Sequence, residues 1–383
     1  MMKVSTRYLL YNFIPPFLLS CVFFVSFLLV FQLFRITRIV IQKGLPFIEL
    51  LELVGHIAVT FLPMAIPISC FFASLYTMNR MSEDSEIVAF RSFGLKKNQL
   101  LMPFLFAGLF VAIGIFSINQ NLIPASKTIF KNTIIKLTSK GVLSDVQPGN
   151  FYTELPNIIL FAEEVSEDKK KLNGVFINLE KNNVAQSIFA KEGVLVKRKD
   201  NAFEMASLRF FLTDGNIVKF NKLTNKTEKI LFKDYDFPIL DGSYTPGFVT
   251  KDSMRSNREL IRVMKQKQKE VDKYLKKNDQ GRAKGAKRSL AKSEIEFFSR
   301  INTPFQCLLF IFLGFIFGIK KSRGKGKSMG SRALTVLIIY YAVFFTGISM
   351  AKKAYMPTYL VVFVPTLLAA MLGMRQYQKL DWT

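Results

Sequence analysis

The chain has 383 residues, of which 50% are apolar and 39 are phenylalanine, and its formal net charge is +25. A soluble protein of this length spreads its apolar residues over short periodic segments; here they gather in long runs, which excludes a wholly soluble fold. The basic excess favours an anionic partner, and the apolar runs favour anionic lipid over nucleic acid.

Six apolar segments are long enough, or nearly so, to cross a hydrocarbon core about 30 Å thick as helices. They cover roughly residues 10–34, 57–79, 100–119, 302–319, 333–350 and 358–374. The 3 cysteines all lie inside apolar runs, so neither a disulfide framework nor a metal cluster is predicted.

The loop between the fourth and fifth spans sets the orientation, because its charged residues are all basic. These residues are Lys320, Lys321, Arg323, Lys325, Lys327 and Arg332. A basic short loop is cytoplasmic, and counting spans from it places both termini and residues 80–99 on the same side. Residues 120–300 are then expected outside the cytoplasm.

The short loop between spans two and three predicts a capped helix over about residues 82–93. Ser82 is the expected N-cap, Glu83 and Asp84 fall in the first turn, and Gly94 follows the last turn. Such a helix can be a tight connector between two spans. It can equally be a docking helix, because Glu86 stands beside the apolar Ile87 and Phe90, which are expected to be exposed.

Basic residues follow the first span at its outer end, namely Arg35, Arg38 and Lys43. Arg35 and Arg38 are three positions apart and share a helical face. Two guanidinium groups on one face suit phosphate recognition, and snorkelling to interfacial phosphates is the alternative.

From about Gly141 to Leu240 the sequence changes to short β-type runs with polar breaks. Candidate strands cover 157–165, 174–179, 187–197, 202–212, 216–221 and 229–237. Asp214-Gly215 predicts a tight turn between two of them. An antiparallel sandwich, a jelly roll and an open barrel all fit this spacing.

Residues 251–300 return to helical composition, with 16 basic and 7 acidic residues by count along the sequence. A solvated helix face is the usual meaning of such a run, and contact with anionic headgroups is the alternative.

Chemistry within the chain is not predicted. The predicted spans contain neither Asp nor Glu, which disfavours an autonomous ion-coupled transporter. There is no catalytic constellation, no cofactor motif and no set of metal ligands.

The order and spacing of these features resemble the LptF/LptG lipopolysaccharide export permease family over essentially the whole chain. The resemblance rests on the three-plus-three spans around a β domain, on Ser85-Glu86-Ile87 with Phe93-Gly94-Leu95, and on Arg300 and Pro304 before the Leu/Phe/Gly run of span four. The loop residues are slightly more similar to LptF than to LptG.

The resemblance implies a membrane α-helical protein with an inserted extracytoplasmic all-β, jellyroll-like domain. Residues 1–135 would hold spans one to three, 136–250 the periplasmic jellyroll, 251–300 a charged helical connector and 301–383 spans four to six. It implies a bacterial inner-membrane location with both termini cytoplasmic.

The resemblance also implies the function of an ABC transporter permease subunit that extracts lipopolysaccharide. Its partners would be a cytoplasmic ATPase dimer, a second permease of the family and a periplasmic jellyroll protein, with membrane lipids around them. Glu86 would contact the ATPase, with Glu83, Asp84 and Phe90 beside it, and Arg35, with Arg38 and Lys43, would lie near the lipid phosphates. No cofactor or metal is implied.

Two other functions remain open from the residues. One is an ABC permease for another amphiphile, such as a lipoprotein, although such permeases usually have four spans. The other is a membrane-anchored sensor or scaffold whose β domain binds a partner, which would not need an acidic docking helix.

Overall fold

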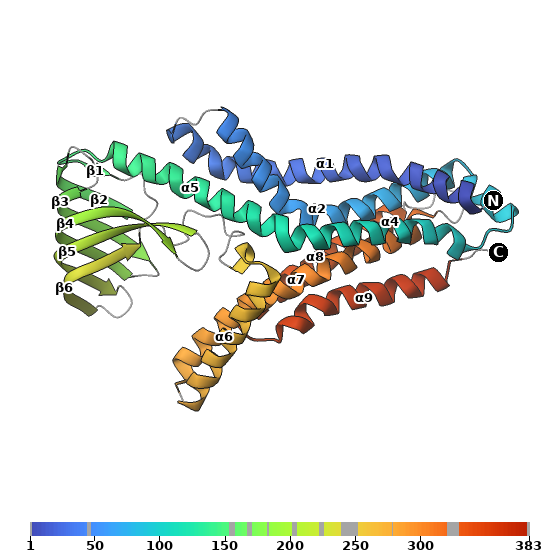
Figure 1. The fold of residues 1–383 in the computed structure, drawn as a ribbon. Helices are drawn as coiled ribbons and strands as arrows, with labels where there is room; N and C mark the ends of the chain where they lie inside the picture. The colour runs from blue at the N-terminus through green and yellow to red at the C-terminus, as the bar shows by residue number, and fades with distance from the viewer. Residues whose placement is uncertain are drawn as a thin grey trace. The chain divides into compact units, whose positions relative to one another are not determined.

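The computed structural model of the chain describes residues 2–43, 47–152, 158–166, 171–181, 184–200, 205–221, 226–238, 252–277, 279–319 and 329–380. The chain forms two compact units, and both are drawn in Figure 1. Unit 1 is helical and consists of Met1–Arg38, Val54–Lys127 and Lys251–Thr383. Unit 2 consists of Ile39–Leu53 and Thr128–Thr250 and contains the β sheet.

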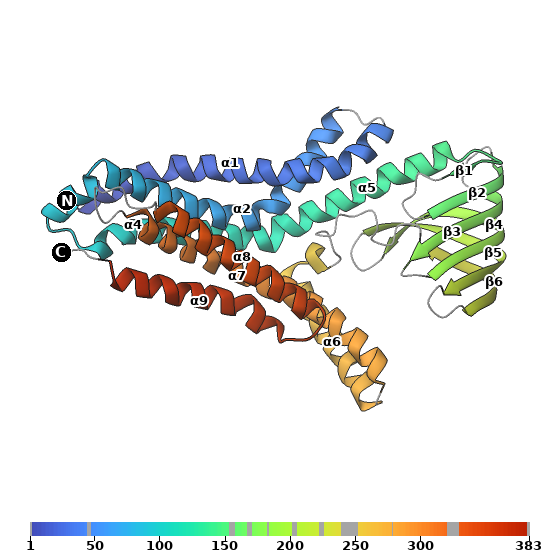
Figure 2. The same cartoon turned by 180° about the vertical axis from the view of Figure 1, so that it is seen from behind.

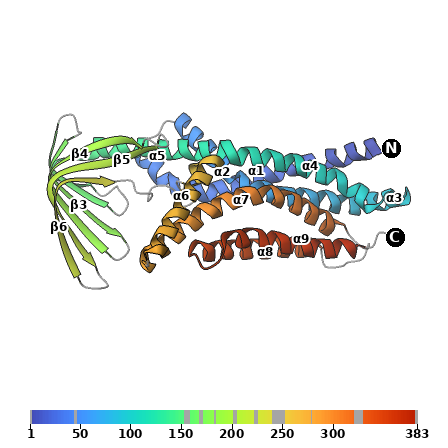
Figure 3. The ribbon, with the colours of Figure 1, turned by 60° about the horizontal axis from the view of Figure 1, so that its bottom comes forward.

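Long helices make up unit 1, and Figures 1 and 2 show them from opposite sides. In chain order, the helices that lie wholly or partly in unit 1 include α1 (Met2–Lys43), α2 (Phe47–Glu83), the short α3 (Glu86–Ser92), α4 (Lys97–Ser117), α6 (Asn257–Lys276), α7 (Gln280–Gly318), α8 (Met329–Lys352) and α9 (Thr358–Gln378). Among the described residues, six helices are long and apolar enough to cross a membrane, which confirms the six predicted spans. The N-terminus and the end of α9 lie at one end of this unit, the end that carries α3 (Figure 3).

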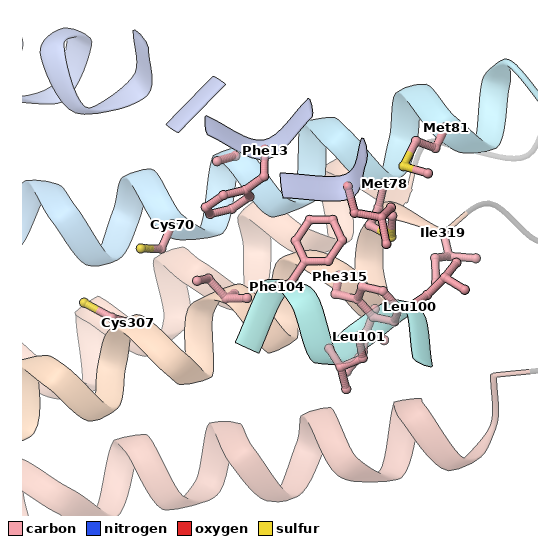
Figure 4. Packing of buried hydrophobic residues seen from close by; sticks show 14 of the residues in the cluster. Phe13, Cys70, Met78, Met81, Leu100, Leu101, Phe104, Cys307, Phe315 and Ile319 are labelled. Atoms are coloured by element: carbon pink, nitrogen blue, oxygen red, sulfur yellow. The ribbon is translucent and has the colours of Figure 1, made fainter. Parts of the chain in front are cut away.

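Helix α7 lies at the centre of unit 1 because its surface lets other helices approach closely. A Cβ added at Gly314 would lie 2.5 Å from the Phe71 carbonyl oxygen of α2, and one at Gly318 would lie 2.5 Å from the Met78 Cβ. Figure 4 shows the apolar cluster that α7 shares with α1, α2 and α4. Within it the Phe104 ring lies 5.6 Å from Phe13 and 5.8 Å from Phe315, at crossed angles that aromatic pairs favour.

Helix α4 continues through a π-helical turn (Ile118–Leu122) into α5 (Ile123–Asp145). The sequence prediction ended span three at residue 119, because polar side chains interrupt the apolar run there. Two polar side chains further along this helix, Ser126 and Lys127, are buried within unit 1. Polar side chains do not remove the intrahelical hydrogen bonds of the backbone, so the helix continues past them.

The described residues of unit 2 form an antiparallel sheet whose six strands follow each other in chain order (Figure 1). The strands are β1 (Phe151–Tyr152), β2 (Ile158–Val165), β3 (Lys171–Lys181), β4 (Val184–Asp200), β5 (Met205–Asn221) and β6 (Lys226–Pro238). Leu160, Ile177, Ile188 and Ile217 pair in register across four strands and are buried, so they form one apolar row of the core. A helical membrane protein with an inserted β domain, as predicted, is confirmed.

The turn predicted at Asp214-Gly215 is wrong, because both residues lie inside β5. Gly215 pairs with Ala190 on one side and Phe232 on the other. Asp214 has a positive φ of 50°, and a Cβ at Gly215 would lie 2.1 Å from the Phe189 carbonyl oxygen. The two residues therefore make a kink that brings neighbouring backbones together, and the predicted strands 202–212 and 216–221 are parts of one strand.

The described residues of the charged stretch 251–300 form a helical hairpin in which α6 packs on the first half of α7 (Figure 1). Ser256 and Glu259 form a capping box, which explains why α6 begins at Asn257. Leu260 and Val271 are the buried residues of α6. The opposite face carries a stripe of basic residues at three- and four-residue spacing, which are Arg258, Arg262, Lys265, Lys269, Lys273 and Lys276.

Candidate functional site

The predicted loop helix exists, and it is shorter at its start than the sequence indicated. Helix α2 continues to Glu83, and α3 runs from Glu86 to Ser92. Ser82, Glu83 and Asp84 therefore belong to the end of α2 and the turn after it, so the prediction that Ser82 caps α3 is wrong. The turn is made at Ser85, whose φ of 60° is left-handed. Just before this turn, Arg80 pairs with Asp84 at 3.6 Å.

The predicted end of α3 at Gly94 is confirmed. Gly94 adopts a φ of 76°, which costs glycine little. Its N–H donates to the Arg91 carbonyl oxygen at 2.8 Å, and the Leu95 N–H donates to that of Phe90 at 3.1 Å. These bonds partner carbonyl groups of the last helical turn and turn the chain toward α4.

Glu86 is half-buried, and its carboxylate oxygens differ. The Tyr8 hydroxyl of α1 donates to Glu86 Oε1 at 2.6 Å. Oε2 is buried and has no hydrogen-bond partner among the described residues. A small cleft of about 30 Å³ opens here between α1, α2 and α3. A buried carboxylate oxygen without a donor is unfavourable, so the Tyr8 hydrogen bond is the contact that holds this carboxylate in the described part of the chain.

The apolar surface of α3 is not the one that the sequence indicated. Ile87 is buried and Phe90 is half-buried against the core of unit 1, so neither is the exposed apolar group. Val88 and Phe93 are exposed instead, at 58% and 79%. The sequence prediction chose Ile87 and Phe90 because they are apolar and lie near Glu86. The sequence alone does not show which face of α3 packs against the neighbouring spans.

An apolar groove of about 290 Å³ lies beside α3 at the same end of unit 1. Its walls are the start of α1, Phe90 and the first turns of α4. The chain thus presents a short helix, two exposed apolar side chains and a groove on one surface, which is the composition of a protein-docking site.

Helix α1 is apolar and mostly uncovered by the rest of the chain. Of its most apolar 18 residues, 6% are buried in the structure. Phe23, Phe27 and Phe31 follow each other along one face with ring centroids 6.3 and 5.1 Å apart, and all three are more than half exposed. Lipid acyl chains or another helix can cover such a face.

The predicted phosphate-binding residues Arg35, Arg38 and Lys43 belong to the last part of α1. Their side chains lie outside the part of the chain that the structure describes. They stay a prediction.

A second charged centre lies where the chain enters α6. Arg300 of α7 is only 4% exposed, and it pairs with Glu296 at 3.0 Å. Its guanidinium donates to the carbonyl oxygens of Asp252, Ser253 and Arg255 and to the Asn257 side chain, at 2.8–3.5 Å. The side chain of Asp252 in turn accepts from Lys267 at 3.2 Å and from Ser293 at 2.9 Å. The guanidinium of Arg300 is thus held from five sides by residues of α7 and of the segment that leads into α6, which identifies a structural clamp.

A chain of buried hydrogen bonds joins α7, α8 and α9. The Gln306 amide donates to the Tyr340 hydroxyl at 2.8 Å, and that hydroxyl lies 3.0 Å from Thr366 Oγ1. Thr366 donates to Asn302 Oδ1 at 3.1 Å, and the Asn302 amide donates to the Val362 carbonyl oxygen at 3.0 Å. Among the described residues, no cluster of side chains is able to hold a metal ion.

Comparison with known proteins gives one family. The family model described as lipopolysaccharide export system permease LptF/LptG matches residues 7–379. The chain is also similar to the uncharacterized protein RP871 of Rickettsia prowazekii (strain Madrid E), with 23% identity over 177 residues. That alignment covers 46% of this chain and 47% of the relative, so it spans about half the length of each.

Proposed function

Because the chain belongs to the LptF/LptG family of lipopolysaccharide export permeases, we propose that it is one of two permease subunits in an ATP-driven exporter. The family and the six spans make it a multi-pass protein of the inner membrane and a transporter component. The exporter would extract lipopolysaccharide from the inner membrane and pass it to a periplasmic jellyroll bridge. The observation that carries this proposal is the family match over residues 7–379.

The proposed orientation puts α3 and both termini in the cytoplasm and unit 2 in the periplasm. The basic loop between α7 and α8, which contains Lys320, Lys321 and Arg323, supports this side for the α3 end.

Energy in this proposal comes from a dimer of ABC ATPases bound to α3. Glu86 supplies a half-buried carboxylate, and Val88 and Phe93 supply exposed apolar surface. Glu83 and Asp84 are exposed beside them and add negative charge, which attracts a basic partner groove.

The lipid in this proposal contacts α1. Its exposed phenylalanines suit acyl chains, and Arg35, Arg38 and Lys43 at its outer end suit phosphates. Unit 2 would continue the route, with the apolar core of its sheet shielding acyl chains from water and a jellyroll partner extending the path.

The test is affinity purification of the tagged chain in mild detergent, followed by mass spectrometry of proteins and lipids that accompany it. A cytoplasmic ATPase, a second six-span permease and bound lipopolysaccharide are expected. A chain that purifies alone, or only with soluble periplasmic proteins, would overturn the exporter and favour the sensor or scaffold.

A further inference from the structure

Helix α1 has two parts that differ in how they are held. In its first part Leu9 and Phe13 are each 2% exposed and belong to the apolar cluster with α2, α3, α4 and α7 (Figure 4 labels Phe13). Beyond them, most of the large apolar side chains are exposed, including Leu19 at 74% and Phe31 at 64%. The helix is therefore buried in this chain at its start, its anchored part, whereas along the span it packs one side on the chain, as at Phe24 against Phe72 of α2, and exposes the other.

Pro15 and Pro16 lie inside α1 where the anchored part ends. Proline has no N–H, so Pro16 leaves the carbonyl oxygen of Asn12 without its intrahelical donor. Thr77 of α2 supplies a donor, with its hydroxyl 3.1 Å from that oxygen. The same missing hydrogen bonds make residues 15–16 the point where α1 bends most easily.

Tyr8 lies one turn before Asn12 and connects this anchored part of α1 to α3. Its hydroxyl donates to Glu86 Oε1 at 2.6 Å, across 78 residues of sequence. A hydrogen bond to a carboxylate is short and strong for its type. It fixes the Glu86 side chain and joins the start of α1 to the start of α3.

We propose that Tyr8 is a positioning residue that holds Glu86 for the ATPase and passes the movement of α3 to α1, with Pro15-Pro16 as the hinge. The inference rests on the proposed function. A displacement of α3 pulls the anchored part of α1 through Tyr8, and the hinge converts that pull into a change of tilt of the lipid-facing part. The ATPase thereby acts on the span that contacts lipid.

A purely structural role for this hydrogen bond predicts something different. It would change the stability of the chain and leave the ratio of lipid moved to ATP hydrolysed as it is. That ratio is therefore the quantity to measure.

The experiment uses the whole complex, reconstituted in vesicles of phospholipid and lipopolysaccharide, with ATP hydrolysis and lipopolysaccharide release measured together. Tyr8→Phe removes only the hydroxyl. Tyr11→Phe is the matched control, because Tyr11 is on the same helix and 75% exposed. Tyr8→Phe is expected to lower the lipopolysaccharide released per ATP by roughly three- to tenfold, the effect of one hydrogen bond, with normal assembly. Tyr11→Phe is expected to match the native chain.

A second pair of variants tests whether Tyr8 acts through Glu86. In a Glu86→Ala chain, adding Tyr8→Phe is expected to cause no further loss of residual release. The inference would be overturned if Tyr8→Phe and Tyr11→Phe released the same amount of lipopolysaccharide per ATP, or if the losses in the double variant were additive. Neither result would contradict the proposed exporter. A native complex that releases no lipopolysaccharide with ATP would instead overturn the proposed function.

Discussion

Helices α7 and α1 are both candidate spans of one chain, and they are built in opposite ways. Of the most apolar 18 residues, 67% are buried in α7 and 6% in α1. Helix α7 contacts α2 through glycines and α9 through Asn302 and Thr366. Helix α1 buries large side chains at its start, and along the span it packs one side on the chain and exposes most of its large apolar side chains. The difference indicates that α7 is the frame of unit 1 and α1 the element whose neighbours are supplied from outside the chain.

The charged side chains attached to these helices differ in the same way. Arg300 of α7 is buried and has an acceptor for each of its donor groups. Glu86, which α1 holds through Tyr8, has one oxygen bonded and one without a partner among the described residues. Breaking a satisfied buried charge cluster is strongly destabilising, because it leaves buried charged and polar groups without partners, whereas an unsatisfied oxygen has no such cluster to lose. Changes near α7 should therefore reduce stability, and changes near α1 and α3 should reduce transport.

The largest expected effect on stability is at Arg300. Arg300→Ala leaves Glu296 and three backbone carbonyl groups without their buried donor, and should lower the free energy of unfolding by about 3–5 kcal/mol. Arg288→Ala changes an exposed arginine of the same helix and should stay within about 0.5 kcal/mol. Denaturant titration in mild detergent measures both. Equal effects would show that the Arg300 clamp is not what holds α6 on α7.

A smaller loss is expected where α7 meets α2. Gly314→Ala places a Cβ 2.5 Å from the Phe71 carbonyl oxygen and should lower the free energy of unfolding by about 1–3 kcal/mol. Gly285→Ala, in the same helix with nothing within 4 Å, should raise it by about 0.5–1 kcal/mol, because alanine is the better helix former. Opposite signs in the same denaturant titration are the prediction, and a loss in both variants would contradict it.

Two adjacent tyrosines of α8 should differ by about 1 kcal/mol. Tyr340→Phe removes the hydroxyl that Gln306 and Thr366 share, and should cost about 1 kcal/mol of unfolding free energy. Tyr341 has a buried hydroxyl without a partner among the described residues, so Tyr341→Phe should be neutral or stabilising. Thermal unfolding of both variants in the same detergent decides this. A larger loss for Tyr341→Phe would mean that its hydroxyl has a partner in the membrane.

The smallest effect is expected on α1. Phe27 is 52% exposed, so Phe27→Ala should change the free energy of unfolding of the isolated chain by no more than about 0.5 kcal/mol. The same change in the assembled exporter should weaken the retention of lipopolysaccharide during purification. A loss of stability comparable with Gly314→Ala would show that α1 is packed like α7, and the comparison would fail.

The membrane helices could be predicted because lipid requires long apolar runs, which the sequence displays directly. Strand β2 was predicted almost to its ends because a short apolar run between polar breaks marks a strand. Helix α5 was missed because Ser126 and Lys127 read as a polar break, although unit 1 buries both. Asp214-Gly215 was wrongly predicted to form a turn between two strands, because the same pair of residues also suits a kink inside one strand.

The candidate site was predicted only in part. Gly94 could be recognised as the end of α3 because helix termination is local and depends on a few neighbouring residues, whereas the role of Glu86 stays a prediction. The exposed positions of Val88 and Phe93 depend on which face of α3 packs against α2 and α4, and sequence periodicity over seven residues does not settle that. Tyr8 could not be paired with Glu86, because a contact between residues 78 positions apart is a product of the fold.

The most direct test of the account is charge reversal at α3 in the reconstituted exporter. Glu86→Arg should keep the chain folded and lower ATP-dependent release of lipopolysaccharide by tenfold or more, the scale of a lost charge-assisted contact. The matched control is Asp272→Arg, a charge reversal on the exposed face of α6. Asp272→Arg should release lipopolysaccharide like the native chain. Normal release by Glu86→Arg would contradict the claim that ATP hydrolysis reaches this permease through α3.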